Sequence, residues 1–582
     1  MPFYFFFPFI YKSGNHPSAL PRASLYLRLS ICLPLFTTYW DMETNVESFL
    51  SSSAAFFVLA SLSLLLLFFA YFSVPYWKVR HVPGPPARFI VGHLPYLASH
   101  GPDVLRAFAK SHGPIFRFHL GRQPLVIVAD AELCREVGIK NFKYIRNRSR
   151  LSPTSGSDLL QNGLFLTRDS RWNITRNLIT ALYQPTHLAG LIPTMNHYVA
   201  AFSAAVSHFH RLREDVPISD LALRLAIDVL GQTAFGIDFK LLSDPTISGV
   251  GDANGDGDEA SAFLKEHTYS VSSLKMDLSS SFSTMLGLIA PVLQIPSRQI
   301  LKRIPGTADH KLERTHQRLC ARLDSIIARR SRELGPGEPR DFLTALLNAR
   351  RQPGTPAAEL LTDGHVRALA YEHLVAGTKT TAFTLAMTVY LVSCHLEVER
   401  RLVAEIDRFG AQSSVPTSED LQSKFPYLDQ VIDIKVIKES MRMYTVSPLV
   451  ARETSQQVKI GEYVLPKGTW VWLALGVVAK DSKQFPAPDV FRPERFDPTC
   501  EEEKQRHPYA HIPFGIGPRS CIGQKFSIQE LKLALIELYR HFIFRPSPMM
   551  DSSPEFEYGL VLGFKRCVKL RAIKRTDSER KK

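Results

Sequence analysis

The sequence predicts a large, mainly α-helical domain with small β-sheets, preceded by a transmembrane helix. Two observations lead to this fold class. Apolar residues recur at spacings of three and four over residues 217–235, 311–333, 363–395 and 396–410, which is the pattern of helices with an apolar face. Residues 54–74 contain no charged side chain, and this run reaches the length of about 20 apolar residues that a spanning helix needs.

The composition limits the class of protein. The chain has 582 residues, of which 45% are hydrophobic, and a formal net charge of +15. This hydrophobic content excludes disorder as the main state. Seven cysteines form no C-x-x-C pair, which argues against a disulfide framework or a cysteine-rich zinc site. The positive charge is diffuse, and the sequence has no helix-turn-helix, zinc-finger or RNA-binding signature, so we expect no nucleic-acid partner.

The uncharged segment also predicts an orientation. Acidic residues precede it, whereas Lys78 and Arg80 follow it. Because basic flanks stay on the cytosolic side, we expect a single-pass protein whose following chain is cytosolic. A cleaved signal peptide would have a shorter apolar core of about 7–15 residues. We therefore expect an uncleaved anchor over residues 42–81 that contacts membrane lipid, preceded by an extension of uncertain status at residues 1–41.

The chain after the anchor, residues 82–582, is expected to form one domain. Residues 244–258 are rich in Gly and Asp and are expected to form a surface loop. Short runs typical of β-strands lie at residues 124–129, 458–465 and 470–475. The domain therefore combines long helices with a small proportion of strand.

The strongest chemical feature is the segment Phe514-Gly-Ile-Gly-Pro-Arg-Ser-Cys-Ile-Gly523. Its glycines let the backbone pass close to a flat ligand or adopt positive φ. Cys521 comes just before a helical pattern at residues 524–541, and a helix N-terminus lowers the pKa of a thiol. A thiolate so placed suits haem iron, where it favours cleavage of an O–O bond. The same residues are also compatible with a buried, inert cysteine in a glycine-rich turn.

This segment resembles the haem-thiolate signature Phe-x-x-Gly-x-Arg-x-Cys-x-Gly of the cytochrome P450 monooxygenases. Three further motifs resemble those of the family and come in its order: Trp172-Asn-Ile-Thr-Arg176, Glu439-Ser-Met-Arg442 and Pro493-Glu-Arg495-Phe. Spacings of three and four put both side chains of a helical pair on one face, although an isolated E-x-x-R is more often a solvated surface pair. The resemblance covers about residues 75–575 and implies the cytochrome P450 fold.

The resemblance also implies a role for each motif residue. Cys521 is expected to bind the iron of haem b, and Glu439, Arg442 and Arg495 are expected to brace the structural core. The other residues expected to bind the cofactor, the last four of them through its propionates, are Phe514, Gly515, Gly517, Gly523, Trp172, Arg176, Arg452 and Arg519. For Arg452, a surface arginine at the start of a strand is the alternative.

The segment Ala376-Gly-Thr-Lys-Thr-Thr381 resembles the oxygen-activating helix of the family. Gly377 is expected to allow a local break in the helical hydrogen bonds, and Thr380 to assist oxygen activation. The family has an acid where this chain has Lys379, and Glu372 lies two helical turns away, too far to substitute directly. A lysine could serve only through water or with a pKa lowered by desolvation. Alternatively, the threonines pack inside the helix and bond to its backbone.

A narrower resemblance concerns the substrate and implies a role in strigolactone biosynthesis. Six segments are similar to the plant carlactone oxidases of that pathway: residues 166–172, 382–385, 427–430, 446–454, 465–477 and 511–519. This similarity implies oxidation of an apolar apocarotenoid, carlactone to carlactonoic acid (methyl to carboxylate), at the endoplasmic reticulum membrane. It also implies O2 as co-substrate and electrons from NADPH through NADPH-cytochrome P450 reductase, since the chain has no G-x-G-x-x-G fingerprint after a strand.

The sequence differs from the carlactone oxidases at a second place, shortly before the E-x-x-R motif. Residues 431–435 are an insertion relative to that subfamily. Five residues turn a helix by about 500°, so either the helix gains about a turn and a half before Glu439 or the segment bulges. Two alternatives to a monooxygenase therefore stay open. One is a haem-thiolate isomerase or lyase independent of O2 and NADPH, which Lys379 favours and Thr380 opposes. The other is an inactive haem-binding membrane protein in which the insertion misplaces Glu439 or Arg442.

Overall fold

The chain divides into two compact units, Met1–Ser73 and Val74–Lys582. The structure, a computed structural model, describes residues 53–243, 259–275, 280–333, 341–408, 416–417, 432–550 and 553–576. The expected N-terminal extension (1–41), the first part of the expected anchor and the expected surface loop at residues 244–258 lie outside this part of the chain.

Helix α2 (Ser53–Trp77) contains the predicted transmembrane segment. Its residues Phe56–Trp77 have a mean hydropathy of 2.3 and are long and apolar enough to cross a membrane. Large apolar side chains are exposed along it, as at Phe57 and Leu66, each 69% exposed. By length and composition, this helix meets the requirements for a membrane anchor.

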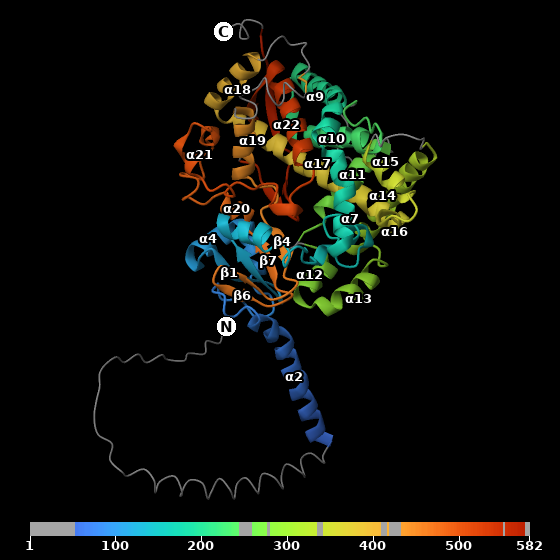
Figure 1. The fold of residues 1–582 in the computed structure, drawn as a ribbon, viewed down its shortest axis with the longest axis vertical. Helices are drawn as coiled ribbons and strands as arrows, with labels where there is room; N and C mark the ends of the chain where they lie inside the picture. Colours follow the sequence, from blue (N-terminus) through green and yellow to red (C-terminus); the bar gives the residue numbers. More distant parts are fainter. Residues whose placement is uncertain are drawn as a thin grey trace, which may run out of the picture. The chain divides into compact units, whose positions relative to one another are not determined.

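The second unit is mainly helical, and its longest helix, α17 (Asp363–Ser393), lies in the middle of the helical part (Figure 1). The hydroxyl of Thr362 accepts a hydrogen bond from the His365 N–H and caps the helix, and Asp363 complements the positive end of its dipole. Much of the helix is buried, against α10 (Ile218–Leu230) and α22 (Gln524–His541) among others. The helices packed around α17 determine which of its side chains face the interior of the domain.

The remaining helices are α3 (Leu94–His100), α4 (Val104–His112), α5 (Ala131–Arg135), α6 (Asp158–Gln161), α7 (Asp169–Thr180), α8 (Pro185–Gly190), α9 (Ile192–Leu212), α11 (Glu259–Ser272), α12 (Phe282–Ile289), α13 (Pro291–Leu301), α14 (Ala308–Glu333), α15 (Phe342–Arg350), α16 (Pro356–Leu360), α18 (Leu396–Arg408), α19 (Ile432–Met443), α20 (Leu475–Val478) and α21 (Glu501–Gln505). A π-helical turn, Gly231–Phe235, follows α10. The expected helices at 217–235, 311–333 and 363–395 are therefore confirmed in outline, as is the one at 396–410 up to residue 408, the last described residue of that segment.

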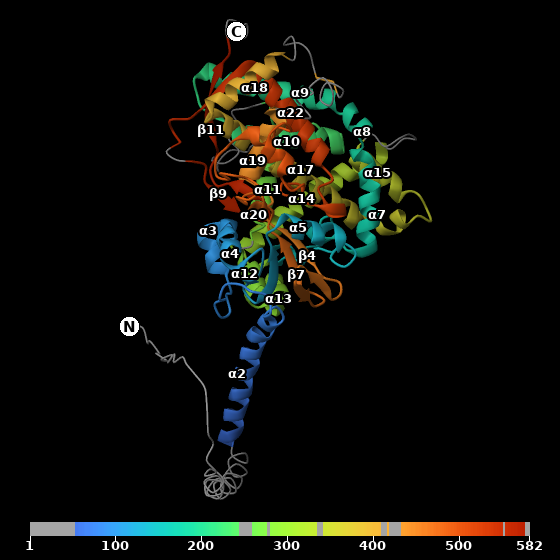
Figure 2. The same cartoon turned by 60° about the vertical axis from the view of Figure 1, so that its left-hand side comes forward.

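The largest sheet has the order β1-β2-β7-β4 and lies at the end of this unit away from α9 and α22 (Figure 1, Figure 2). Its strands are β1 (Ile115–Leu120), β2 (Gln123–Val128), β7 (Trp470–Leu473) and β4 (Val450–Glu453). Strand β7 pairs parallel with β2 and antiparallel with β4. The sheet thereby joins segments separated by more than 300 residues, and it carries Arg452 on β4.

Three smaller sheets complete the fold of the described residues. They comprise β3 (Val216–Pro217), β11 (Lys569–Lys574) and β8 (Phe542–Pro546), then β5 (Val458–Ile460) with β6 (Tyr463–Leu465), and β9 (Phe556–Tyr558) with β10 (Leu562–Phe564). The expectation of one strand at residues 458–465 is wrong. Gly461, with φ of 55°, turns the chain there, and the two halves pair with each other. The expected class, mainly α with small β-sheets, is confirmed.

Helix α19 shows where the extra residues before Glu439 lie. Residues 432–435 are helical and continue into Glu439 without a bulge. Lys435 is buried in this helix and forms an ion pair of 2.5 Å with Asp497. Val431 lies outside the described residues. Of the two expectations for this segment, the lengthened helix holds for residues 432–435.

Candidate active site

The loop before α22 presents Cys521. The Cys521 N–H donates to the Phe514 carbonyl at 2.8 Å and closes the loop. Gly515 and Gly517 have φ of 79° and 71°, values that side chains rarely adopt. A Cβ on Gly517 would also lie 2.0 Å from the carbonyl oxygen of Gly138. The backbone conformation and close packing of this loop therefore require Gly515 and Gly517, whatever ligand the loop binds.

The side chain of Cys521 is exposed, and it faces a cavity inside the domain. Burial raises the pKa of its thiol, while a hydrogen bond from the Gly523 N–H and the charges of Arg176 and Arg148 lower it. The net direction is upward, so the lowering expected from the helix N-terminus is wrong for the protein by itself. A bound metal cation would reverse this balance, since a coordinating thiol is deprotonated outright.

The cavity that Cys521 faces, called the inner cavity, has a volume of about 370 Å³. It brings together segments from α7, α17 and the cysteine loop, which are far apart in the sequence. The predicted site residues that line it are Trp172, Arg176, Gly377, Thr380, Phe514, Gly515, Arg519, Cys521 and Gly523. Gly517 and Arg452 do not line it. The remaining wall is largely apolar, with side chains such as Leu160, Val446 and Leu560.

Three arginines, Arg148, Arg452 and Arg519, are buried beside this cavity and form what we call the arginine cluster. Burial lowers the pKa of Arg148 to about 10 and that of Arg519 to about 9, and it lowers the pKa of Arg452 well below the ordinary value, with repulsion among the arginines adding to the effect. Within the described residues, Nε and Nη2 of Arg452 and Nε of Arg148 have no hydrogen-bond partner. Buried guanidiniums need an anionic partner, and the two propionates of a haem fit this requirement.

Arg519 and Arg176 are better satisfied by the protein itself. Nη2 of Arg519 donates to the Thr167 carbonyl at 2.8 Å, and its guanidinium lies 4.1 Å from the ring of Trp172. Nη1 of Arg176 donates to the Ser520 carbonyl at 2.9 Å. Both arginines therefore hold neighbouring backbone segments as well as lining the cavity. Arg452 is fully buried, so its alternative assignment as a surface arginine is wrong.

Helix α17 passes the inner cavity without the break expected at Gly377, because it is helical from Asp363 to Ser393. Gly377 instead lies against α10, where a Cβ would be 3.0 Å from Cδ2 of Leu230. Thr380 Oγ1 donates to the Ala376 carbonyl at 2.7 Å, as the helix-packing alternative expected. Thr380 nevertheless lines the cavity, and its hydroxyl oxygen keeps acceptor capacity for a ligand.

Sequence reasoning missed Arg148 as a residue of this cavity and set Glu372 aside as too distant to replace the acid, but both line the cavity. Glu372 accepts a hydrogen bond from the Phe165 N–H at 2.7 Å, and burial raises its pKa to about 7, against the lowering effect of this bond and of Arg148 and Arg519. A Cβ on Gly163 would lie 1.6 Å from its Oε2. Arg148 lies in the basic segment 146–150, the one sequence signal available, whereas nothing in the sequence places Glu372 beside it.

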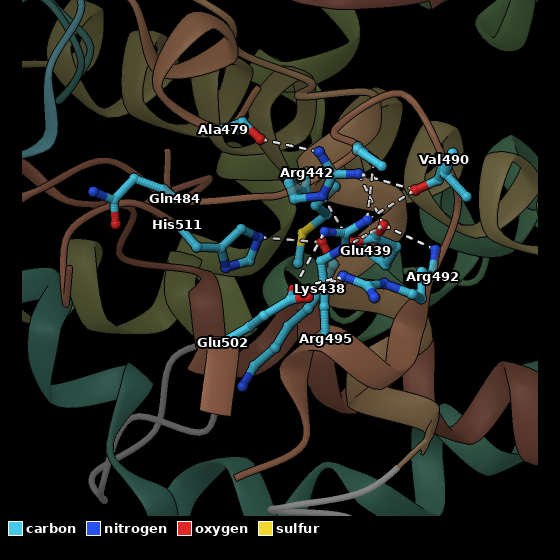
Figure 3. Close-up of polar contacts among 12 residues, drawn as sticks. Lys438, Glu439, Arg442, Ala479, Gln484, Val490, Arg492, Arg495, Glu502 and His511 are labelled. Carbon is cyan, nitrogen blue, oxygen red and sulfur yellow. Dashed lines mark hydrogen bonds and ion pairs between the residues drawn. The ribbon is translucent and has the colours of Figure 1, made fainter. Parts of the chain in front are cut away.

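A second polar group, which we call the brace, consists of Glu439, Arg442 and Arg495 (Figure 3), and none of the three lines the inner cavity. Arg442 makes a two-pronged contact with Glu439, at 2.7 and 2.8 Å, and Nε of Arg495 lies 3.1 Å from the same carboxylate. All three side chains are fully buried. Backbone carbonyls accept the remaining guanidinium hydrogens, as Ala479 does from Arg442 and Pro486 from Arg495.

A mainly helical fold, a glycine-rich loop presenting one cysteine to an apolar cavity, and buried arginines beside that cavity are the features of a haem-thiolate protein. The family model for cytochrome P450 matches residues 82–567. The chain therefore belongs to the cytochrome P450 family. Members of this family carry haem-thiolate iron and use O2 with electrons from a reductase, so the chain is a monooxygenase.

Curated relatives cover most of the chain. Thromboxane-A synthase of Mus musculus is 25% identical over 85% of this chain and 92% of its own length. Cytochrome P450 3A12 of Canis lupus familiaris is 25% identical, and cytochrome P450 3A14 of Cavia porcellus 26% identical, each with the same coverage. These relatives support the family but do not support the plant carlactone oxidases, so that narrower resemblance stays a prediction from the motifs.

Proposed function

We propose that this monooxygenase oxidises an apolar apocarotenoid, carlactone to carlactonoic acid, at the endoplasmic reticulum membrane with its catalytic domain in the cytosol. The observation that carries the site assignment is that Cys521 and Thr380 line the same apolar cavity. The choice of carlactone is supported by the motif similarity to carlactone oxidases and by the apolar wall. The membrane location is supported by α2 and the basic residues that follow it.

In this proposal Cys521 would hold the iron of haem b. Arg452 and Arg148 would meet its propionates with the N–H groups that have no partner among the described residues, and Arg176, Arg519 and Trp172, which line the cavity, would enclose them. When bound, haem with a thiolate ligand supplies cleavage of the O–O bond of O2 and insertion of one oxygen atom into a C–H bond. NADPH-cytochrome P450 reductase is the proposed source of the electrons.

The remaining roles belong to the cavity walls. The apolar side chains exclude water and hold an apolar substrate, which strengthens every electrostatic interaction inside the cavity. The Thr380 hydroxyl donates to the Ala376 carbonyl and can accept a hydrogen bond from a ligand in the cavity. Conversion of a methyl group to a carboxylate takes three successive oxidations, so the same wall must retain the alcohol and aldehyde between turnovers.

Replacement of Cys521 tests its assignment as the iron ligand. Recombinant protein, reduced and treated with carbon monoxide, should show the Soret band of a haem thiolate, and Cys521→Ser should abolish this band. Cys394→Ser, at an exposed cysteine, is the matched control and should keep it. A Cys521→Ser protein with an unchanged thiolate spectrum would contradict the assignment.

Product analysis tests the substrate and the alternatives. Microsomes with reductase, fed carlactone, should form carlactonoic acid, and unchanged carlactone with haem-replete protein would contradict the proposed substrate. Turnover that persists without reductase and O2 would favour the isomerase or lyase alternative. Failure to incorporate haem, cured by deleting residues 431–435, would favour the inactive alternative.

A further inference from the structure

The oxygen-activating helix has a lysine in place of the family's acid, but a carboxylate from another element lies beside that lysine. Nζ of Lys379 on α17 lies 3.0 Å from Oε1 of Glu557 on β9, 178 residues later in the chain. The same ammonium donates to the hydroxyl of Ser272 at 3.2 Å. Nζ of Lys275 lies 3.6 Å from the other oxygen of Glu557. The carboxylate therefore sits between two cations beside the helix position where the family has its acid.

This ion pair stands between two cavities. A second cavity of about 940 Å³, called the outer cavity, adjoins the inner one. Four residues line both: Val271, Ser272, Lys379 and Glu557. Charged and polar side chains such as Asp220 and Arg224 line the outer cavity, whereas the inner wall is largely apolar. Lys379 and Glu557, each about one-fifth exposed, are thus the charged residues of the wall that the two cavities share.

We propose that Glu557 relays protons from water in the outer cavity to water in the inner cavity beside Thr380, in place of an acid at position 379. In each relay event the Glu557 carboxylate takes a proton from water on the outer side, releases one to water on the inner side, and ends as the carboxylate it was. The reductase supplies the electrons, and solvent supplies the protons. The proposal rests on the shared cavity of Cys521 and Thr380, but not on the identity of the substrate.

Glu372 and Lys379, two other titratable side chains of the inner cavity, are less suited to the relay. Glu372 precedes Thr380 by eight residues, about 12 Å along the helix axis at 1.5 Å per residue, and the Phe165 N–H holds one of its oxygens. Lys379 can only donate while it is an ammonium, and its loss of a proton would leave Glu557 with one cation fewer. Burial raises the pKa of Glu557, but the two lysines and Ser272 outweigh this effect and lower it, so the carboxylate is the resting form.

Three variants of the full-length holoenzyme, assayed with reductase, distinguish a role of Glu557 in proton relay from a purely structural role of its ion pair with Lys379. Glu557→Gln removes both. Lys379→Met/Glu557→Gln replaces the pair by neutral groups, and Lys379→Glu/Glu557→Lys reverses it, which returns the acid to the helix. The measurements are the thermal unfolding midpoint and the ratio of peroxide to water formed per NADPH, with and without carlactone. Glu555→Gln, at an exposed position of the same segment, is the matched control.

Glu557→Gln leaves the ammonium of Lys379, which is about one-fifth exposed, without its carboxylate, so we expect the thermal unfolding midpoint to fall by about 2–5 °C. The neutral and reversed pairs should recover most of this loss. If Glu557 relays protons, the peroxide-to-water ratio should rise about tenfold in Glu557→Gln and in the neutral pair, toward the low end of general acid–base effects because water still carries protons. The reversed pair and Glu555→Gln should stay within about twofold of wild type.

A neutral pair with a wild-type peroxide-to-water ratio would overturn the proposal, because the ion pair would then be purely structural. A reversed pair that recovers the midpoint but not the ratio would overturn it as well. An unchanged midpoint in Glu557→Gln would show that the ion pair does not form. Failure of wild type to consume carlactone contradicts only the proposed substrate, since the ratio measured without carlactone still reports the relay.

Discussion

The brace and the arginine cluster are two groups of buried arginines in one domain, and they differ in what neutralises them. In the brace, Glu439 bonds to both Arg442 and Arg495, and backbone carbonyls accept the other hydrogens. In the arginine cluster, Arg452 is equally buried but has two nitrogens without a partner among the described residues. The brace is complete within the protein, whereas the cluster requires an anion from outside it.

Because of this difference, we expect the brace to matter for folding and the arginine cluster to matter for ligand binding. A buried ion pair adds little net stability, but removal of one partner leaves an uncompensated charge in the interior. Substitutions in the brace should therefore damage the fold whether or not a cofactor is bound. Substitution of Arg452 or Arg148, which have nitrogens without a partner among the described residues, should weaken the bound state and relieve the unbound one. Arg519 differs because it also donates to backbone carbonyls.

The largest effect is expected for Glu439→Ala. It leaves two guanidiniums buried without their carboxylate, so the free energy of unfolding should fall by about 3–5 kcal/mol. Denaturant unfolding of the apoprotein measures this loss, and the yield of haem-loaded protein should fall with it. An unfolding free energy within 1 kcal/mol of wild type would show that the brace is not needed for folding.

Arg452→Met should separate the two groups. The loss of charge-assisted hydrogen bonds to an anionic ligand is worth about 1.5–3 kcal/mol, which corresponds to roughly 10- to 100-fold weaker haem retention. The apoprotein should be no less stable than wild type, since an unpaired buried charge has been removed. Haem transfer to an acceptor protein gives the first quantity and denaturant unfolding the second.

The sequence predicts the brace better than the arginine cluster, for a physical reason. Glu439 and Arg442 are three residues apart on one helix, so their contact follows from helical geometry, and the family resemblance supplied Arg495. Arg148 reaches the cavity only through tertiary packing, and Glu557 meets Lys379 across 178 residues. Likewise, the apolar periodicity of the sequence predicted the long helices. It did not predict the turn at Gly461, which divides the expected strand at residues 458–465 into two.

The pH dependence of stability tests the burial of Glu372 beside the arginine cluster, because burial raises its pKa while Arg148 and Arg519 oppose that rise. Its pKa is raised from 4.5 to about 7, so between these values the folded protein binds more protons than the unfolded chain does. Its contribution to stability is therefore present below about pH 4.5 and is lost as the pH rises to about 7. Because this side chain also faces the cavity, we expect a loss of about 1–2 kcal/mol.

Glu372→Gln should flatten this part of the stability–pH curve. The measurement is the denaturant unfolding free energy of apoprotein at several pH values from 4.5 to 7.5. A variant whose curve keeps the wild-type slope would assign the titration to another group. The same slope in Glu494→Gln, whose side chain is 44% exposed, serves as the control.

The smallest effect is expected for Glu494→Gln, which separates burial from charge pairing. Glu494 precedes Arg495 in the chain, and its carboxylate lies 2.7 Å from Nη1 of Arg401, as close as the contacts in the brace. The two side chains are 44% and 48% exposed, so water already solvates both charges. We expect the free energy of unfolding to fall by less than about 0.5 kcal/mol, measured under the conditions used for Glu439→Ala. A loss as large as that of Glu439→Ala would mean that proximity, and not burial, gives the brace its importance.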